Sequence, residues 1–113
     1  MKKIAVIFGT RPDTIKMAPI IKELERQSEH FKLITIATAQ HRQMLDQVLD
    51  VFKIKPDFDL NIMKPSQTLA TITKNTIEEL DIIFEKEKPD LVLVQGDTTT
   101  TFVGSLAAFY RQI

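Results

Sequence analysis

Aliphatic residues in this chain form short continuous runs, separated by longer segments in which they recur every three or four positions. Three runs predict strands, at about residues 3–8, 32–38 and 90–95. Because polar residues do not alternate within these runs, we expect parallel strands that helices cover on both faces. A shorter extended piece at residues 58–60 predicts an additional edge strand.

The segments between these runs predict four helices, because their apolar residues fall on one stripe of a helix. The expected inner faces are, in chain order, Met17, Ile20, Ile21 and Leu24; then Met44, Leu45, Val48, Leu49 and Phe52; then Leu69, Ile72, Thr76, Ile77, Leu80 and Phe84; and finally Phe102, Val103, Leu106 and Tyr110. Lys88-Pro89 is expected to end the third helix. Strands that alternate with helices indicate an α/β fold with a doubly wound parallel sheet.

Composition limits the classes of function that this sequence can serve. Lys plus Arg and Asp plus Glu both number 15, so no net charge favours nucleic acid or anionic membranes as partners. The absence of cysteine excludes disulfides and a thiol nucleophile. The first apolar run is too short for a signal peptide or a membrane span, so we expect a cytoplasmic protein.

The familiar nucleotide and metal signatures are absent from the sequence. The three glycines, Gly9, Gly96 and Gly104, cannot form a dinucleotide-binding or P-loop motif. The two histidines, His30 and His41, lack a nearby carboxylate cluster of the kind that holds zinc. The sequence therefore predicts no cofactor and no metal.

The loop that follows the first predicted strand carries candidate chemistry. Small molecules bind open parallel sheets beyond the carboxyl ends of the strands, close to helix N-termini. Gly9 allows a sharp turn there, and Arg11 and Lys16 beside a helix start would suit a diphosphate. The alternative is that Arg11 pairs with a neighbouring carboxylate and that Lys16 is solvated surface.

A second loop, Gly96 to Thr101, follows the 90–95 strand. If the first strand lies between the second strand and this one, Arg11 and Asp97 face the same crevice. The alternative for Asp97 is a helix N-cap, which is its common fate at such a position. The threonine hydroxyls are candidates for binding phosphate or sugar, or for bonding to their own backbone.

The segment from residue 38 to 43 also gathers hydrogen-bond donors. Gln40, His41 and Gln43 lie where the second strand gives way to a helix. Such a group suits a nucleotide or a sugar, whereas a plain polar helix start is the simpler interpretation.

These motifs together resemble the non-hydrolysing UDP-N-acetylglucosamine (UDP-GlcNAc) 2-epimerases of bacteria, along the whole chain. The resemblance rests on Phe8–Pro12, Ile15–Pro19, Thr38–Asp46, Asp59–Met63, Gly96–Thr101 and Ser105–Tyr110. It implies that residues 1–113 are the first part of the Rossmann-like N-terminal domain of a GT-B-like enzyme, with the rest of that domain and a C-terminal domain absent. The chain end on an apolar helix, with no strand after it, also predicts a fragment. The alternative is a small four-strand domain that dimerises to cover the exposed edge.

The resemblance implies interconversion of UDP-GlcNAc and UDP-ManNAc, in which UDP leaves by anti elimination and then adds back. Position by position, it implies catalytic roles for Arg11, Lys16 and Asp97, substrate contacts for Gly9, Thr10, Arg11, Lys16 and Thr98, and an allosteric UDP-GlcNAc site at Gln40, His41 and Gln43. It further implies a homodimer that supplies ManNAc for cell-surface polysaccharide.

The sequence departs from the family pattern at four positions. Asp13 replaces the usual glutamate, Thr14 an alanine, Gln95 a histidine, and Ser66 an arginine that some members use at the allosteric site. We expect the chain alone to be inactive. The alternative function is a non-catalytic module that binds UDP or pairs with a full-length subunit. A receiver-type regulator is disfavoured, because Gly9-Thr10-Arg11 stands where its acidic cluster would be.

Overall fold

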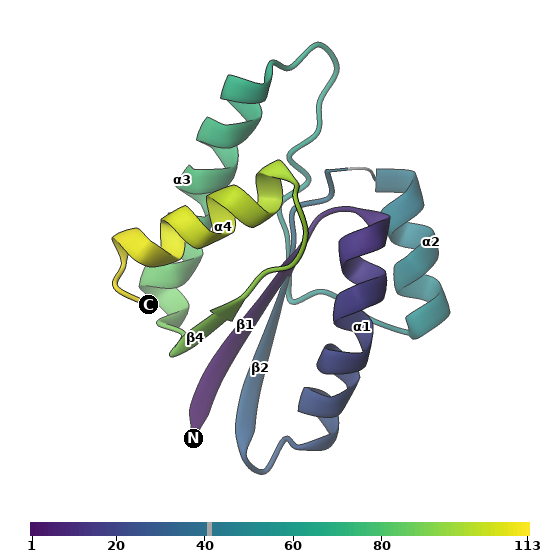
Figure 1. Ribbon diagram of the computed structural model, residues 1–113, viewed down its shortest axis with the longest axis vertical. Coiled ribbons are helices and arrows are strands. Elements are labelled where there is room, and N and C mark those ends of the chain that lie inside the picture. Colours follow the sequence, from purple (N-terminus) through teal and green to yellow (C-terminus); the bar gives the residue numbers. More distant parts are fainter. Residues whose placement is uncertain (41) are drawn as a thin grey trace.

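The computed structural model describes residues 1–40 and 42–113, which form a parallel sheet between two pairs of helices (Figure 1). The strands lie in the order β3 (Phe58–Asp59), β2 (Phe31–Ala37), β1 (Lys2–Phe8), β4 (Leu91–Leu93). Each adjacent pair is parallel. This confirms the predicted doubly wound α/β architecture, and it places the first strand at the centre.

Helices α1 (Arg11–Arg26) and α2 (Arg42–Phe52) cover one face of the sheet, and α3 (Leu69–Glu87) and α4 (Thr99–Tyr110) cover the other (Figure 1). Strand β1 supplies both cores, because successive side chains point to opposite faces. Ile4, Val6 and Phe8 pack in the core of α1 and α2. Ala5 and Ile7 pack in the core of α3 and α4.

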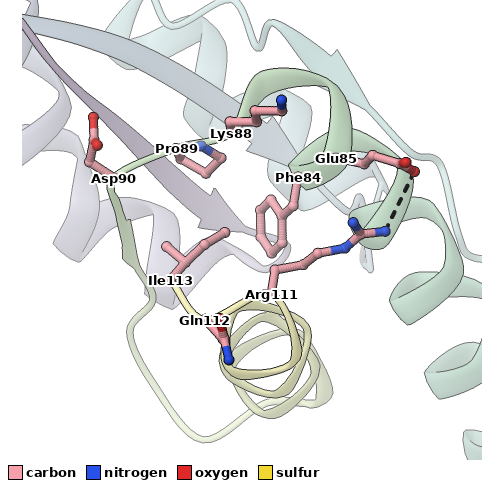
Figure 2. A pocket seen from close by; sticks show the side chains of 8 residues that line it. All are labelled: Phe84, Glu85, Lys88, Pro89, Asp90, Arg111, Gln112 and Ile113. Carbon is pink, nitrogen blue, oxygen red and sulfur yellow. Dashed lines mark hydrogen bonds and ion pairs between the residues drawn. The ribbon is translucent and has the colours of Figure 1, made fainter.

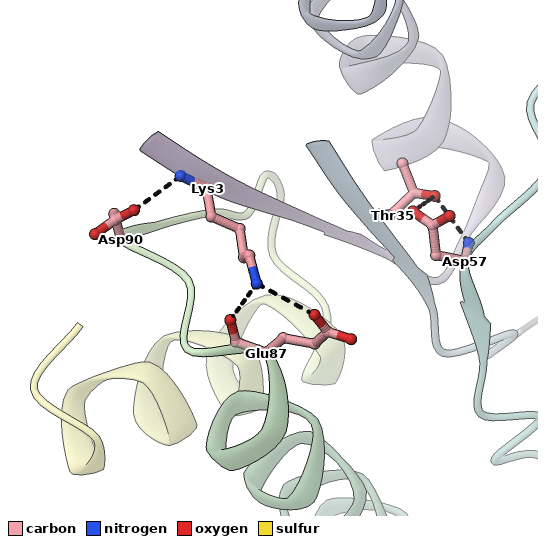
Figure 3. A network of polar contacts seen from close by, with 5 residues as sticks. All are labelled: Lys3, Thr35, Asp57, Glu87 and Asp90. Carbon is pink, nitrogen blue, oxygen red and sulfur yellow. Dashed lines mark hydrogen bonds and ion pairs between the residues drawn. The ribbon is translucent and has the colours of Figure 1, made fainter. Parts of the chain in front are cut away.

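Polar contacts hold the amino-terminal ends of the two edge strands, β4 and β3, against the central strands β1 and β2 (Figure 3). The Lys3 backbone N–H donates to Asp90 Oδ2 at 2.8 Å, and Lys3 Nζ donates to the Glu87 carbonyl at 2.7 Å. The Thr35 N–H donates to Asp57 Oδ2 at 2.8 Å. These bonds hold the entries to β4 and β3 in register with the central strands.

Local sequence signals explain where α3 begins and ends. Thr68 is its N-cap, and its hydroxyl accepts a hydrogen bond from the Thr71 N–H at 3.1 Å. The helix stops at Lys88, which adopts a left-handed conformation with φ of 49° and precedes Pro89. The predicted stop at Lys88-Pro89 is therefore confirmed.

Three expectations about burial are wrong. Strand β4 is short and half exposed, with Leu91 at 49% exposure, because β1 is its only neighbour among the described residues. On α4 the predicted inner residues Phe102 and Tyr110 are 62% and 64% exposed. Smaller residues face the sheet instead, namely Val103, Gly104, Ala107 and Ala108. The predicted inner residues Ile20, Met44 and Leu69 are also exposed.

Close packing explains which face of α4 is buried. A Cβ atom added to Gly104 would lie 3.0 Å from Val94 Cγ1 and 3.1 Å from Ile7 Cδ1. The helix backbone therefore lies directly on the sheet, and only small side chains fit beneath it. This leaves the bulky aromatic residues of α4 on the opposite face.

Candidate functional site

The loops that follow β1, β2 and β4 meet at the carboxyl edge of the sheet around Gly9. A Cβ atom added to Gly9 would lie 2.0 Å from Thr38 Oγ1 and 2.6 Å from Thr100 Oγ1. Real Cβ atoms do not make such short contacts, so glycine is required here. The side chains of Thr38 and Thr100 therefore fill the space beside the Gly9 backbone.

A relay of hydrogen bonds joins two of these loops. Thr100 Oγ1 donates to Gln40 Oε1 at 3.0 Å and lies 2.9 Å from Thr38 Oγ1. A hydroxyl has only one hydrogen to donate, so Thr38 must donate to Thr100. The relay ties the segment after β2 to the first turn of α4. In the sequence, nothing distinguishes Thr100 from the other threonines of its run, and Thr38 carries no signal of its own.

The carboxylate of Asp13 organises the β1–α1 loop from within. The side chain is 3% exposed. Its Oδ1 accepts from the N–H of Thr10 at 2.8 Å and from the Thr10 hydroxyl at 2.7 Å, and its Oδ2 accepts from the Gly9 N–H at 3.2 Å. The backbone donors of Gly9 and Thr10 therefore face Asp13. Contacts of Gly9 and Thr10 with a ligand stay a prediction. Such contacts would use atoms other than these backbone N–H groups.

Arg11 and Lys16 are both exposed near the start of α1. Ion pairs within residues 1–40 and 42–113 include neither cation, so the structure does not support pairing of Arg11 with a neighbouring carboxylate. Arg11 borders a shallow groove of about 320 Å³ between α1 and α2. Lys16 lies five positions later, about 140° further round the helix. The two side chains thus leave α1 on different flanks, and they would have to reach one diphosphate from two sides of the helix start.

Asp97 is exposed in the loop between β4 and α4. It is not the N-cap of α4, because that position belongs to Thr98, whose hydroxyl accepts from the Thr101 N–H at 3.4 Å. The N-cap interpretation of Asp97 is therefore wrong. The Thr98 hydroxyl, a candidate for binding phosphate or sugar, caps α4 instead. Whether Thr98 also contacts substrate stays a prediction.

The loops that carry Arg11 and Asp97 are neighbours, as the sequence predicted. Their strands, β1 and β4, pair in parallel with Val6 opposite Leu93, so both loops leave the same edge of the sheet. Gly96 adopts φ of 107°, and a Cβ atom added there would lie 3.8 Å from Asp13 Cβ. The β4–α4 loop therefore rests against the first turn of α1. The catalytic roles of Arg11, Lys16 and Asp97 stay predictions.

The segment predicted to hold a second nucleotide sugar is only partly described. Gln40 is half-buried and turns inward to Thr100, whereas Gln43 is exposed at the start of α2. His41 lies outside the described residues. The proposed allosteric role of Gln40, His41 and Gln43 therefore stays a prediction.

A hollow of about 750 Å³ lies at the opposite, amino edge of the sheet (Figure 2). Arg111 lines it, but its guanidinium already bonds to Asp81 at 2.6 Å and lies 3.5 Å from Glu85. The hydrogen bond from Arg111 lowers the pKa of the Asp81 carboxyl from its ordinary value. Because parallel sheets bind ligands at their carboxyl edge, we place the candidate site at the Gly9 and Gly96 loops rather than here.

The described residues contain no group of three or more His, Cys, Asp or Glu side chains that could hold a metal ion. In the same part of the chain, no helix combines the length and the apolar character that a membrane crossing needs.

Comparison with known proteins gives consistent matches. The profile of the UDP-N-acetylglucosamine 2-epimerase family matches residues 22–113. The UDP-N-acetylglucosamine 2-epimerase of Bacillus subtilis (strain 168) is 65% identical over 115 residues, covering 100% of this chain and 30% of that protein. The structure of UDP-GlcNAc 2-epimerase from Neisseria meningitidis bound to UDP-GlcNAc has a TM-score of 0.92 at 58% identity, covering 98% of this chain and 30% of that one.

A more distant structure agrees. Methanocaldococcus jannaschii UDP-GlcNAc 2-epimerase in complex with UDP-GlcNAc and UDP has a TM-score of 0.90 at 37% identity, over 98% of this chain and 30% of that one. The chain thus spans about 30% of the length of these relatives. The structural matches confirm the expected fold class, an α/β sheet corresponding to the amino-terminal part of a GT-B-like epimerase.

Proposed function

Because the chain belongs to the UDP-N-acetylglucosamine 2-epimerase family, we propose that it is part of an enzyme that interconverts UDP-GlcNAc and UDP-ManNAc. Within that enzyme, residues 1–113 form the first part of the Rossmann-like N-terminal domain. The observation that carries the proposal is the adjacency of two loops on parallel neighbours β1 and β4, one with the cation Arg11 and the other with the carboxylate Asp97.

The chemistry of the reaction explains why these residue types are needed. The C2 proton of the sugar has no adjacent carbonyl to acidify it, so direct removal is prohibitive. In the proposed reaction the C2–H and C1–O bonds break in an anti elimination that releases UDP and leaves a C1–C2 double bond. UDP then adds back at C1 while a proton is delivered to the other face of C2.

Each proposed role follows from the surroundings of the residue. Arg11 and Lys16 stabilise the negative charge that develops on the departing diphosphate. Since neither cation forms an ion pair among the described residues, substrate binding displaces no such partner. Asp97 belongs to the acid and base groups near C2. It is exposed and does not cap α4, so its carboxylate is available for proton transfer.

The wider setting of the enzyme is also a proposal. It works as a cytoplasmic homodimer, supplies ManNAc for cell-surface polysaccharide, and requires no cofactor. Gln40, His41 and Gln43 contribute to a second UDP-GlcNAc site. The 113-residue chain alone does not turn over substrate, because the remaining acid and base groups and the second domain lie outside it.

A chimera tests the proposed function directly. Residues 1–113 replace the matching segment of the Bacillus subtilis relative, which is 65% identical and supplies the rest of the protein. We expect this chimera to form UDP-ManNAc from UDP-GlcNAc and the isolated chain to form none above a no-enzyme control. The unmodified relative is the positive control. A folded chimera without activity would contradict the proposal.

A weaker function, binding of UDP without turnover, is favoured for the isolated chain by its two exposed cations. Calorimetry with UDP measures it. Loss of binding in Arg11→Ala would support a role for Arg11 in binding the nucleotide. Unchanged binding would show that Arg11 does not contact UDP.

A further inference from the structure

The carboxylate of Asp13 is enclosed by the β1–α1 loop. It is 3% exposed and accepts three hydrogen bonds, from the backbone N–H groups of Gly9 and Thr10 and from the Thr10 hydroxyl. Within the part of the chain that the structure describes, no cation pairs with it. Its negative charge is balanced by these donors and by the N-terminus of α1.

These bonds extend beyond ordinary helix capping. A capping box joins an N-cap residue to the third residue of the helix, here Thr10 and Asp13. The additional bond from the Gly9 N–H at 3.2 Å reaches the residue before the cap. Asp13 therefore fixes the backbone on both sides of the turn that leads into Arg11.

Asp13 also touches the second loop of the candidate site. The Cβ position of Gly96 lies 3.8 Å from Asp13 Cβ, which is ordinary van der Waals contact. Gly96 immediately precedes Asp97, so the Asp13 side chain lies between the turn that presents Arg11 and the turn that presents Asp97.

We propose that Asp13 is a positioning residue that sets the separation between the loops of Arg11 and Asp97, an inference that rests on the proposed function. Asp13 already uses the N–H groups of Gly9 and Thr10, so the diphosphate is left to the side chains of Arg11 and Lys16. A misplaced loop would therefore weaken the charge stabilisation on which UDP departure depends.

Three variants of the chimera separate positioning from simple stability. Asp13→Asn keeps the shape of the side chain but replaces one acceptor oxygen by an NH₂ group. This donor would face a backbone N–H group that needs an acceptor. Asp13→Glu keeps a carboxylate at the usual capping-box position. Thr14→Val is the matched control, because it removes a buried hydroxyl that donates to the Thr10 carbonyl at 2.6 Å in the same turn, while the Thr14 N–H retains its own bond to that carbonyl.

Steady-state kinetics are measured under conditions in which urea unfolding shows every variant to be folded. For Asp13→Asn we expect kcat to fall on the order of tenfold to a hundredfold, with a smaller change in KM. Asp13→Glu should recover most of the parent kcat, and Thr14→Val should keep it despite a lower stability. Equal losses of kcat in Asp13→Asn and Thr14→Val, or an unchanged kcat in Asp13→Asn, would overturn the proposal.

Hydrogen exchange provides a second measurement that does not depend on turnover. In Asp13→Asn, peptides covering residues 94–98 should exchange faster than in the parent, whereas Thr14→Val should leave them unchanged. Unchanged exchange in Asp13→Asn would contradict the positioning role even in an inactive chimera. An inactive parent chimera with the expected exchange pattern would contradict only the proposed function.

Discussion

The hydroxyl oxygens of Thr38 and Thr100 lie 2.9 Å apart, although the two residues are 62 positions apart in the chain. A Cβ atom added to Gly9 would collide with both hydroxyls. Thr100 also donates to Gln40. These contacts pack together the segments that follow β1, β2 and β4. A substitution in one segment should therefore alter the packing of the other two.

Gly9→Ala should destabilise the chain more than most single-methyl changes. The new Cβ would lie 2.0 Å from Thr38 Oγ1 and 2.6 Å from Thr100 Oγ1, so the loops must move apart. Overpacking of this kind costs about 1–3 kcal/mol. Urea unfolding measures the loss, and combining the change with Thr38→Ala should restore part of it.

Gly104→Ala provides the comparison for that experiment. Its Cβ would lie no closer than 3.0 Å to a neighbour, and alanine is a better helix former than glycine by about 1 kcal/mol. We expect a much smaller change in unfolding free energy than for Gly9→Ala. Equal losses at the two positions would show that the threonine contacts do not constrain Gly9.

Thr100→Val should lower the unfolding free energy by about 1–3 kcal/mol, because a buried site loses its hydroxyl and the Gln40 amide loses its donor. Thr100→Ser keeps the hydroxyl and should retain most of the stability apart from the lost methyl group. If valine and serine behave alike, the hydrogen-bond relay contributes little.

Asp97→Asn in the chimera should reduce kcat on the order of a hundredfold or more, because an amide does not transfer the proton. Asp50→Asn, which neutralises an exposed carboxylate on α2, is the matched control and should leave kcat unchanged. Full activity of Asp97→Asn would remove this residue from the acid and base groups.

Arg11→Ala in the chimera should lower kcat/KM on the order of a hundredfold through lost stabilisation of the diphosphate charge. The control is Arg26→Ala, at the far end of the same helix, where the guanidinium pairs with Glu23. Arg26→Ala should change stability slightly and activity not at all. Similar kinetic effects of the two variants would argue against a special role for Arg11.

The Asp81–Arg111 pair should stabilise the chain at neutral pH and lose its effect in acid. The hydrogen bond from Arg111 holds the pKa of Asp81 below its ordinary value of about 3.9 in the unfolded chain. A group with a depressed folded-state pKa contributes stability above its unfolded value, and the contribution disappears as pH falls through the folded value.

Thermal unfolding of the parent and of Asp81→Asn checks this pH dependence. The parent should have the higher Tm at pH 7, and the difference should close as the pH falls below about 4. Because both side chains are partly exposed, high salt should also reduce the difference. A Tm difference that persists at pH 2 would show that the substitution acts through packing instead.

Regular patterning explains why the sheet was predictable. The continuous aliphatic runs of β1 and β2 indicate burial on both faces, and the structure buries Ile4–Phe8 and Ile34–Ala37. The adjacency of the Arg11 and Asp97 loops was predicted on the condition that the first strand lies between the second strand and the 90–95 strand, and the observed strand order meets that condition. The end of α3 was also predictable, because Pro89 follows Lys88 and stops the helix.

Packing between segments that are distant in the sequence was not predictable. Helix α4 is apolar around most of its circumference, so periodicity did not show that Ala107, rather than Phe102, faces the sheet. The threonine run offered four equivalent hydroxyls, and only the approach of Thr38 identifies Thr100 as the buried one. Asp13 was recognisable in principle, since Thr10 and Asp13 have the spacing of a capping box.

The central position of β1 has a consequence for synthesis on the ribosome. This strand is translated before both of its neighbours, and β4, on one side of it, is not translated until Leu91–Leu93. Until those residues leave the exit tunnel, the nascent strand presents an open edge of aliphatic backbone. Unpaired strand edges can pair with other chains, so the growing polypeptide is exposed to aggregation at this edge until Leu93 is free to pair.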